Sequence, residues 1–571
     1  MNDDKRLILD NNKGKLPTIE QLKQIKHFLS LKEKRILIIF ISLAIISLSL
    51  FLGKIFWNFL IEVPRYGGEY TEGVVGSISY INPLLSQTND VDRDISKLVF
   101  SGLFRMNNDG ELEKDLISGY EISDDQKTYT FTLKDNIYFH DDTKLIPEDI
   151  EFTLTSIQDQ SFNSPLYKTF KGIVYEKVSD NSFRLILTEA FSPFLSTLTF
   201  GILPSHLWQN IPAGNSGLTE LNKKPIGTGP FQYKSFKKDS SGKIIQYTLY
   251  RFDDYYGKKP YLKIINFKLF DDTDTAIEYL KSGRINGIGF LSQDNLSKVE
   301  DLNSINIHTF DMPRYTALFF NPKNQELLKD KNIRQAISLA INKKELAQEA
   351  EISEKEAYGP LDFIINPGTD EYDIKKSAEL LKSAGWSLED GTLKKGDKKL
   401  ELTITSVDNA EYIKILQYIK RQWGKIGIVT NLEIIPKDKI TSQTIEPRNY
   451  QILLYGQILS YDPDPYPFWH SSQVVTGLNL SIFADKDIDS ILESARTTTL
   501  FDERIKKYEE FQKILKDQYM SIFLFRPTYN YPVSKNIKGV DGKIVYLSSD
   551  RFSNIYNWYI KTKKTFKTKN N

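Results

Sequence analysis

The sequence predicts an α/β protein that lies outside a membrane and follows a single N-terminal transmembrane helix. Residues 36–52 form an apolar run without a charged side chain, and the run continues past Lys54 to Ile61. It thus reaches the roughly twenty residues that a helix needs to cross a bilayer. A buried helix of a soluble domain is the alternative, but such a helix usually carries a polar face, which this run lacks. After Tyr315, strand-like and helix-like segments alternate, which is typical of an α/β domain with a mostly parallel sheet.

The charges that flank the apolar run predict its orientation. Arg65 is the only positive charge in the residues just after it, whereas five lie just before it: Lys23, Lys26, Lys32, Lys34 and Arg35. The positive-inside rule therefore places residues 1–35 in the cytoplasm and the chain after about Val63 outside. A cleaved signal peptide would have a short basic start and a small-residue exit. Neither feature is present, so we predict an uncleaved signal anchor at residues 36–61.

The composition limits how the outer part is stabilised and what it binds. The chain has no cysteine, so it can form neither a disulfide nor a lipid anchor on an N-terminal cysteine. Its 75 Lys and Arg residues balance 74 Asp and Glu residues. This balance leaves no field that would attract nucleic acid. We therefore expect a protein that its core alone holds together, with no nucleic-acid partner.

The first half of the outer part predicts strands with short helices between them. A linker with Pro64 and Gly67-Gly68 precedes it, and from Tyr70 the chain becomes globular. Phe131 and Leu133 alternate with threonines, as in a half-buried strand, and Pro147 suits the first position of a helix. The expected strands are 71–81, 129–133, 231–236, 244–250 and 262–270, and the expected helices are 95–103, 148–157 and 274–282.

The second half predicts a longer alternation of strands and helices. Asp373 is placed to cap a helix that ends at Gly385. The expected strands are 315–320, 400–404, 428–435, 450–455 and 522–525, and the expected helices are 333–341, 374–385, 413–426, 488–495 and 503–515. We also expect a short cytoplasmic helix after Pro17 and a disordered basic tail at residues 561–571.

Motifs of catalysis or metal binding are missing from the sequence. It has no Gly-x-Ser-x-Gly elbow, no His-Glu-x-x-His and no cysteine nucleophile, and its five histidines are scattered. The turn Gly227-Thr-Gly-Pro230 is no phosphate loop, because no lysine and helix follow it in the required places. A pair of carboxylates for glycoside hydrolysis is not excluded among 74 acids, but nothing selects one. We predict no catalytic residue, no metal site and no cofactor.

A proline-rich run at residues 460–470 is the best candidate for a ligand contact. It follows a predicted strand and carries two carboxylates and four aromatic side chains on a stiff loop. Ligands of α/β sheets bind outside the carboxyl ends of strands. The alternative is that the aromatic side chains attach the loop to its own domain. The candidates in this run are Ser460, Tyr461, Asp462, Asp464 and Trp469.

Several motifs in a fixed order carry a family resemblance from about Gly68 to Asn557. The longest is Tyr129-Thr-Phe-Thr-Leu-Lys-Asp-Asn-Ile-Tyr-Phe-His-Asp-Asp-Thr-Lys-Leu-Ile-Pro-Glu-Asp-Ile-Glu-Phe-Thr153, in which Asp142 stands where the family has glycine. The others lie at 226–231, 255–261, 333–342 and 378–386. In these segments the chain resembles the extracytoplasmic solute-binding proteins of the oligopeptide, dipeptide and nickel class, which feed ABC importers.

The resemblance implies a two-lobed, periplasmic-binding-protein-like fold of type II with an extra subdomain in the first lobe. We expect strands to cross between the lobes near residues 310–320 and 520–531. The implied divisions are a cytoplasmic segment at 1–35, the anchor at 36–61, a linker at 62–69, lobe I at 70–314 with its extra subdomain at about 92–200, lobe II at 315–520, and a return to lobe I at 521–560.

The resemblance also implies where ligand binds. The loop of Gln87, Thr88 and Asn89 matches a segment that clamps ligand from the first lobe. Gly456, Gln457 and Ile458 match main chain that pairs with an extended peptide. The aspartate that takes the free amine of a peptide in oligopeptide binders aligns with Ser460, so Asp462 or Asp464 would have to replace it. A hydroxyl is a weaker partner for an ammonium group than a carboxylate is.

We therefore expect a monomeric, membrane-anchored receptor that closes its lobes on a peptide or peptide-like solute and delivers it to an ABC permease with its ATPase subunits. The same fold could instead bind a metal chelate, an oligosaccharide or a signalling peptide, as the loss of the amine-binding aspartate suggests. An extracytoplasmic hydrolase is disfavoured, because no catalytic motif is present.

Overall fold

The structure is a computed structural model that describes residues 29–58, 60–352, 355–366, 368–369 and 371–566. It divides into two compact units, one of residues 1–65 with 561–571 and the other Tyr66–Ile560. The helix expected after Pro17 lies outside the described residues. Each unit is described by itself.

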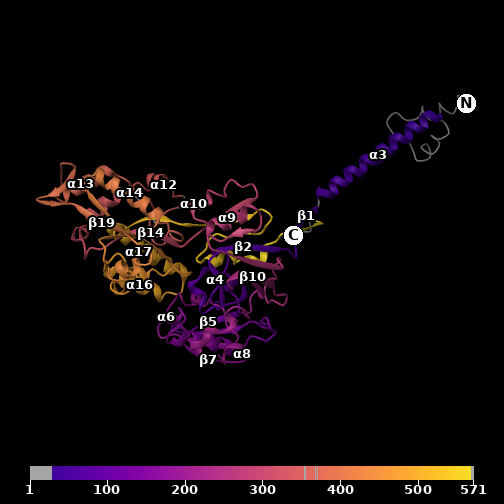
Figure 1. Ribbon diagram of the computed structural model, residues 1–571, viewed down its shortest axis with the longest axis horizontal. Coiled ribbons are helices and arrows are strands. Elements are labelled where there is room, and N and C mark those ends of the chain that lie inside the picture. The colour runs from indigo at the N-terminus through magenta and orange to yellow at the C-terminus, as the bar shows by residue number, and fades with distance from the viewer. Residues whose placement is uncertain (1–28, 59, 353–354, 367, 370, 567–571) are drawn as a thin grey trace. The chain divides into compact units, whose positions relative to one another are not determined.

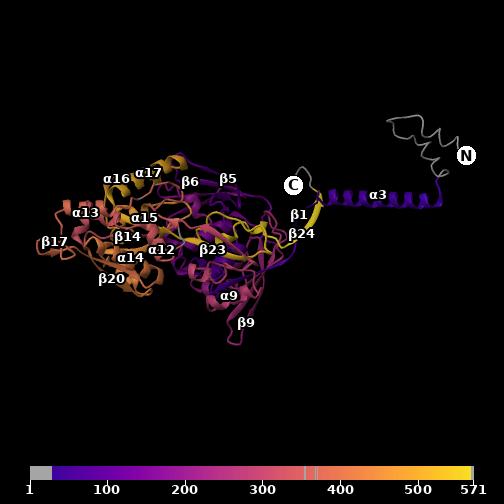
Figure 2. The same cartoon turned by 90° about the horizontal axis from the view of Figure 1, so that it is seen from above.

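The first unit consists of a long apolar helix and a two-stranded ribbon. The helix α3 (Leu31–Asn58) contains the segment Leu31–Leu52, which is long and apolar enough to cross a membrane, with a mean hydropathy of 2.6. Figure 2 shows α3 as one straight helix. Strand β1 (Leu60–Arg65) pairs antiparallel with β24 (Lys561–Phe566). The disorder expected from residue 561 is therefore wrong for the strand. Its threonines favour extended backbone, and Glu62 lies opposite Lys564.

The first lobe of the second unit is built on a seven-stranded mixed sheet. The strand order is β13-β23-β12-β2-β11-β10-β9. The bounds are β2 Glu69–Val75, β9 Phe231–Lys238, β10 Ile244–Arg251, β11 Ile264–Phe270, β12 Gly287–Ile288, β13 Ile305–Asp311 and β23 Thr528–Ser534. The helices that accompany it are α4 Asp90–Val99, α9 Thr273–Lys281 and α10 Gln293–Leu296. Much of the sheet is fully buried, so this lobe has a core of its own.

A smaller four-stranded sheet forms the extra subdomain of this lobe, in the order β5-β6-β8-β7. The predicted alternation is present in β6, whose residues alternate between half-buried and buried, and α5 starts at Pro147 as expected. The bounds are β3 Phe104–Met106, β4 Leu112–Lys114, β5 Ile117–Ile122, β6 Thr128–Leu133, β7 Val174–Lys177, β8 Ser182–Ile186, α5 Pro147–Gln158, α6 Tyr167–Phe170, α7 Phe194–Thr197 and α8 Ser205–Trp208.

The second lobe has a six-stranded sheet in the order β15-β22-β14-β21-β19-β20. Among the described strand pairs of this sheet, only β21-β19 and β19-β20 are parallel, so the expectation of a mostly parallel sheet in this lobe is wrong. The strands are β14 Arg314–Phe320, β15 Lys355–Glu356, β19 Glu401–Val407, β20 Val429–Ile435, β21 Ile452–Ile458 and β22 Ser521–Arg526, and a small sheet holds β16 Ser387–Glu389, β17 Thr392–Lys395 and β18 Lys398–Lys399.

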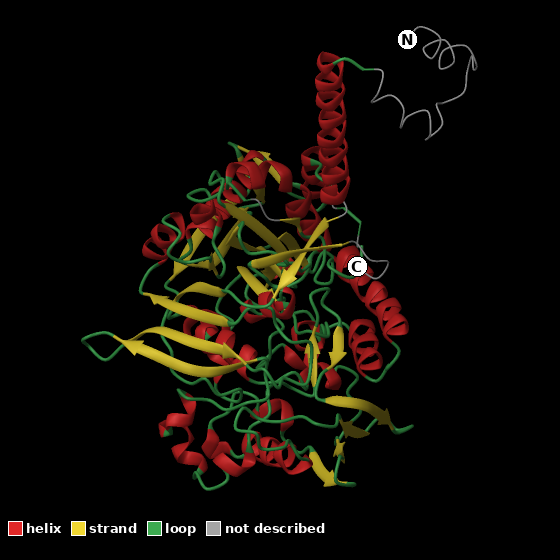
Figure 3. Cartoon of the chain, turned by 90° about the vertical axis from the view of Figure 1, so that its right-hand side faces the viewer, coloured by secondary structure: helices red, strands yellow, loops and turns green. Residues whose placement is uncertain are grey.

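Helices complete this lobe, and several of them are labelled in the orange part of Figure 1. Asp373 caps α13 as predicted, with its side chain accepting from the backbone of Lys375 and Lys376. The helices are α11 Lys331–Leu339, α12 Lys343–Glu349, α13 Ile374–Ser383, α14 Ala410–Lys425, α15 Tyr466–Trp469, α16 Lys486–Arg496 and α17 Phe501–Gln518. Figure 3 distinguishes helices, strands and loops of the chain by colour.

Two strand crossings join the lobes. The chain leaves the seven-stranded sheet along β13 and enters the six-stranded sheet as β14, and it returns from β22 to β23. Because the chain enters the second lobe along β14 and leaves it along β22, these two strands run antiparallel. The six-stranded sheet therefore contains both parallel and antiparallel pairs. Since β22 still belongs to the second lobe, the return begins after Arg526 rather than at residue 521. The extended crossings leave hinge motion to only two short backbone segments.

A buried ion cluster joins the elements of the first lobe. The guanidinium of Arg551 donates from Nε to Glu72 Oε1 at 3.0 Å and from Nη1 to Asp94 Oδ1 at 2.9 Å. Tyr531 donates its hydroxyl to Glu72 Oε2 at 2.9 Å. Burial raises the pKa of Glu72, and the charge of Arg551 opposes that rise. The cluster connects β2, α4 and β23 to the 3₁₀ helix η8 (Ser548–Phe552).

His140 explains the glycine-rich turn of the first lobe. Gly227 N–H donates to His140 Nδ1 at 3.2 Å, and Nε2 lies 3.0 Å from the Gly229 carbonyl oxygen, to which it donates. This arrangement uses the neutral ring, with its proton on Nε2. Burial lowers the pKa of His140 to about 4.

We expect acid to weaken the fold through His140. Because its folded pKa lies below the unfolded value of 6.5, its contribution is complete above pH 6.5 and is lost as the pH falls towards 4. Between pH 7 and pH 5 the free energy of unfolding should fall by about 2 kcal/mol more in the wild type than in the non-titrating variant His140→Gln. Urea unfolding at several pH values measures this difference. Parallel curves for the two proteins would contradict the assignment.

Candidate ligand-binding site

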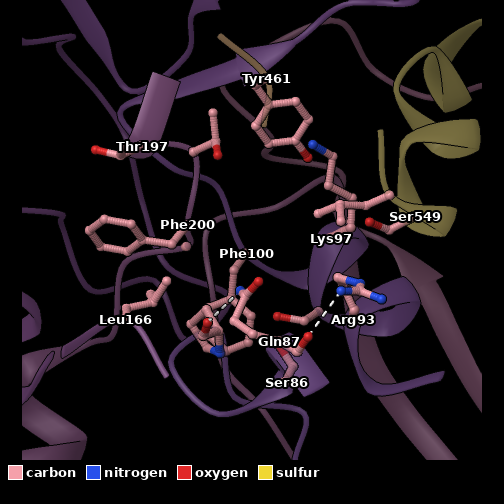
Figure 4. Close-up of a pocket in the computed structure, with 15 residues that line it drawn as sticks. Ser86, Gln87, Arg93, Lys97, Phe100, Leu166, Thr197, Phe200, Tyr461 and Ser549 are labelled. Carbon is pink, nitrogen blue, oxygen red and sulfur yellow. Dashed lines mark hydrogen bonds between the residues drawn. The ribbon is translucent and has the colours of Figure 1, made fainter. Parts of the chain in front are cut away.

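A cavity of about 100 Å³ is lined by residues of both lobes. Gln87 reaches it from the first lobe and Tyr461 from the second, so the structure brings together two of the predicted site residues. Figure 4 shows Tyr461 on one side of the cavity, with Gln87 and Ser86 at its other end. The remaining wall comes mainly from α4 and the segment around Phe200.

The segment 87–89 is held firmly but uses its side chains differently from the expectation. Gln87 lies in the 3₁₀ helix η1 (Ser86–Thr88) and donates to the Pro83 carbonyl oxygen at 3.1 Å. Thr88 is exposed. Asn89 is the N-cap of α4, since its Oδ1 accepts from Val91 N–H at 3.0 Å. This cap starts the helix at Asp90 rather than at residue 95, and it leaves Asn89 with a structural role.

The strand that carries Gly456, Gln457 and Ile458 has one open edge. On one side β21 pairs with β14 along its whole length, from Ile452 to Ile458. On the other side, within the described chain, β19 pairs only with Ile452, Leu453 and Leu454. Residues 455–458 thus extend past the end of their neighbour, so their main chain is placed to accept another strand.

The side chains of this strand end support that edge. Gln457 is buried, where it accepts from the Tyr315 hydroxyl and donates to the Leu478 carbonyl oxygen at 2.9 Å. A Cβ on Gly456 would lie only 3.1 Å from the Tyr412 hydroxyl, a tight contact that a glycine avoids. Arg314 Nε, beside Gly456, is buried without a hydrogen-bond partner among the described residues.

Tyr461 connects the lobes. Its hydroxyl donates to Asp550 Oδ1 at 2.9 Å, and its ring meets Tyr546 edge to face at 4.9 Å. Burial raises the pKa of Tyr461 well above its ordinary value, so the hydroxyl remains a donor. Ser460 beside it is exposed, and its hydroxyl donates to the Asp462 carbonyl oxygen at 2.6 Å.

The two carboxylates of the proline-rich run are both paired with arginines. Asp462 Oδ2 accepts from Arg504 Nη2 at 2.6 Å, and Arg504 Nη1 reaches across to the Ser192 hydroxyl of the first lobe at 2.6 Å. Asp464 Oδ2 accepts from Arg496 at 2.7 and 2.9 Å. Burial raises the pKa of Asp462, and Arg504 opposes the rise. One oxygen of each carboxylate is therefore paired with an arginine, whereas Asp462 Oδ1 is buried without a hydrogen-bond partner among the described residues.

Trp469 belongs to the core of the second lobe. It is 4% exposed and packs against Phe319, Phe511 and Phe523, with ring centroids 5.9 to 6.3 Å apart. For this residue the structure matches the alternative that the aromatic side chains attach the loop to its own domain.

Two cations of the cavity were missed by the sequence analysis. Arg93 and Lys97 lie one turn apart on α4 and both line the cavity. The predicted helix at 95–103 begins after Arg93. The signal that could have found the pair is Asn89 as a helix cap, because a helix that starts at Asp90 places residues four apart on one face. No cluster of possible metal ligands occurs in the described part of the chain.

Two α/β lobes joined by two strand crossings, with a cavity between them and an open strand edge beside it, define the class of two-lobed solute-binding proteins. The model of the bacterial extracellular solute-binding proteins, family 5 Middle, matches residues 111–476. The chain belongs to this family.

Known proteins of this kind resemble the chain over most of its length. The oligopeptide-binding protein AppA of Bacillus subtilis is 29% identical, over 87% of this chain and 92% of that protein. Its structure in complex with a nonapeptide has a TM-score of 0.66 and 26% identity, and covers 87% of this chain and 100% of that one. The structure of the substrate-binding protein CtaP of Listeria monocytogenes has a TM-score of 0.74 and 27% identity, and covers 87% of this chain and 100% of that one. The structure of NikZ of Campylobacter jejuni in complex with Ni(L-His) has a TM-score of 0.67 and 26% identity, and covers 86% of this chain and 99% of that one.

We expect replacement of Trp469 to reduce stability and leave ligand affinity unchanged. Trp469→Ala removes a buried indole and should cost about 3–5 kcal/mol of unfolding free energy, whereas Trp469→Phe should cost less. Urea unfolding gives the stability, and calorimetry well below the unfolding temperature gives the affinity. A large loss of affinity in a Trp469→Phe variant of normal stability would place the indole in the ligand site instead.

Proposed function

We propose that this chain is the membrane-anchored receptor of an ABC importer and binds peptides or peptide-like solutes between its lobes. One observation carries the proposal: the open edge of β21 at residues 455–458 leads within three residues to Tyr461, which lines the cavity between the lobes. Extended peptides bind such edges through main-chain hydrogen bonds, which are common to all peptides. The nonapeptide complex of AppA supports this ligand class.

Lobe closure is the mechanism that we propose for ligand capture. Tyr461 with Asp550, and Arg504 with Ser192, are contacts that exist only when the lobes are together. A ligand that touches both lobes stabilises the closed state by its differential affinity. The permease and its ATPase subunits would then recognise that state. No catalysis is needed for this role, and we propose that the protein is not an enzyme.

The topology that we propose has a cytoplasmic N-terminus, one membrane crossing along α3 and the monomeric binding unit outside. The apolar segment Leu31–Leu52 supports the crossing, and the basic residues before it support the orientation. A metal chelate remains the second candidate ligand, because NikZ carries Ni(L-His).

Main-chain recognition predicts that backbone methylation abolishes binding. The full-length protein in detergent micelles would be incubated with a mixture of peptides of three to six residues, and retained species identified by native mass spectrometry. For a retained peptide, N-methylation of each amide in turn should weaken binding about 2- to 10-fold where that amide pairs with β21, because each bond contributes about 0.5–1.5 kcal/mol. A peptide with all its amides methylated should not bind. Equal affinity for methylated and unmethylated peptides would rule out strand pairing.

Closure predicts that Ser192 affects affinity although it lies outside the cavity wall. Ser192→Ala removes the hydrogen bond from Arg504 in the closed state, and should raise the dissociation constant about 3- to 10-fold through a less stable closed form. Ser179→Ala, an exposed serine of the same subdomain, is the matched control. Small-angle scattering with and without ligand would report the closure. An unchanged dissociation constant in Ser192→Ala would show that this contact does not contribute to it.

A further inference from the structure

We propose that the first-lobe wall of the cavity is an anion subsite, in which Arg93, Lys97 and Ser86 bind a carboxylate of the ligand. The inference rests on the proposed function, and it makes the ligand's acid, rather than its amine, the group that the receptor recognises.

Unused hydrogen-bond donors face the cavity. Ser86 is 1% exposed, lines the cavity, and its hydroxyl has no partner among the described residues. Arg93 gives Nη1 to the Gln87 carbonyl oxygen at 3.0 Å and Nη2 to Asp90, but its buried Nε has no partner in the described part of the chain. A buried donor without an acceptor costs free energy, which a ligand oxygen would recover.

Lys97 adds a second positive charge on the same helix face. Its Nζ lies 3.8 Å from Asp550 Oδ1, beyond hydrogen-bonding distance. Figure 4 shows Lys97 and Arg93 on the same side of the cavity. Like charges one helical turn apart repel each other. An anion between them would relieve that repulsion.

The cavity wall itself contains no carboxylate, although an acid outside the wall lies beside each cation. No carboxylate is among the described residues that line the cavity. Arg93 pairs with the exposed Asp90. Asp550, which lies 3.8 Å from Lys97, already accepts from the Tyr461 hydroxyl at 2.9 Å and from Leu547 N–H at 2.9 Å. Asp462 and Asp464 are paired with arginines. The site therefore favours a carboxylate over an ammonium group, which agrees with a serine at position 460.

The source of the carboxylate can be the C-terminus of a peptide or an acidic side chain. Four mixtures of peptides of three to six residues separate the two. Three contain no Asp or Glu and have free ends, an acetylated N-terminus or an amidated C-terminus. The fourth is amidated and contains Glu. Each is tested on the full-length protein in detergent micelles by native mass spectrometry, followed by calorimetry with retained peptides.

We expect the free and acetylated mixtures to bind alike, and amidation to weaken binding at least tenfold. Arg93→Gln and Lys97→Gln should each weaken binding of the free acid about tenfold and reduce the difference between acid and amide. Lys281→Gln removes the same charge from the exposed face of α9 and should behave as the wild type. Recovery of binding by the amidated mixture with Glu would assign the carboxylate to a side chain and support the subsite.

Other outcomes overturn the inference without touching the proposed function. Equal binding of acid and amide by the wild type would do so. So would loss of binding on acetylation alone, which would indicate an amine anchor. The difference in binding between acid and amide could also disappear in Arg314→Gln but persist in Arg93→Gln and Lys97→Gln. That result would place the carboxylate beside β21 instead. Thermal unfolding without ligand checks that each variant folds, and Lys97→Gln decides the question if Arg93→Gln does not.

If no peptide mixture binds, the proposed function fails and the subsite is tested separately with glutarate. A saturable rise in unfolding temperature that disappears in Arg93→Gln and Lys97→Gln would support an anion subsite for another solute. No rise in the wild type would overturn it.

Discussion

The buried guanidinium of Arg551 is the interaction on which the first-lobe wall of the cavity depends. It binds Glu72 of β2 and Asp94 of α4 while it belongs to η8 itself. Helix α4, which contains Asp94, also carries the cavity cations Arg93 and Lys97, and η8 carries Ser549 of the cavity lining. Taking these charges out of water is expensive, and only mutual pairing with full hydrogen bonding offsets the cost. Because the cluster tolerates little distortion, it fixes α4 against the sheet and gives the cavity a rigid wall.

The polarity of the cavity follows from where acids find partners. The chain is almost neutral as a whole, with a formal net charge of +1. Around the cavity, however, Asp94, Asp462 and Asp464 are each paired with an arginine. Arg93 pairs with Asp90, but Arg93 and Arg314 each keep a buried Nε without a partner in the residues that the structure describes, as Asp462 keeps a buried Oδ1. The cavity lining itself contains Arg93 and Lys97 and no carboxylate, although no excess of positive charge is visible in the composition.

Local patterns predicted most elements, because they depend on residues close in sequence. The strand at 129–133, the helix that begins at Pro147 and the cap at Asp373 follow from alternation, a fixed φ angle and a side-chain acceptor. Strand direction does not follow from such patterns. The sheet of the second lobe is mixed because β14 and β22 connect it to the other lobe, and this connection is a property of the whole chain.

The site was harder to predict, because its decisive contacts join distant segments. Asp462 resembles an amine anchor in the sequence, but Arg504, 42 residues away, pairs with its Oδ2 and leaves only the buried Oδ1 without a partner among the described residues. Trp469 resembles a stacking platform, but three phenylalanines from β14, α17 and β22 enclose it. Gln87 and Tyr461 were found through the resemblance and the proline-rich run. Arg93 and Lys97 were not, because a pair of cations on a helix usually faces solvent.

An open strand edge and a charged pocket solve different parts of the recognition problem. Main-chain bonds to residues 455–458 would attract any extended peptide, but they are the same in every register. At about 0.5–1.5 kcal/mol each, they distinguish poorly between a peptide and the same peptide shifted by two residues. A single carboxylate held by Arg93 and Lys97 would fix the register without restricting the side chains. Tyr461 lies between the two features, since it follows β21 in the chain and lines the cavity. Closing the lobes would then bring the anchored end and the paired backbone together, which links broad acceptance of solutes to one defined closed state.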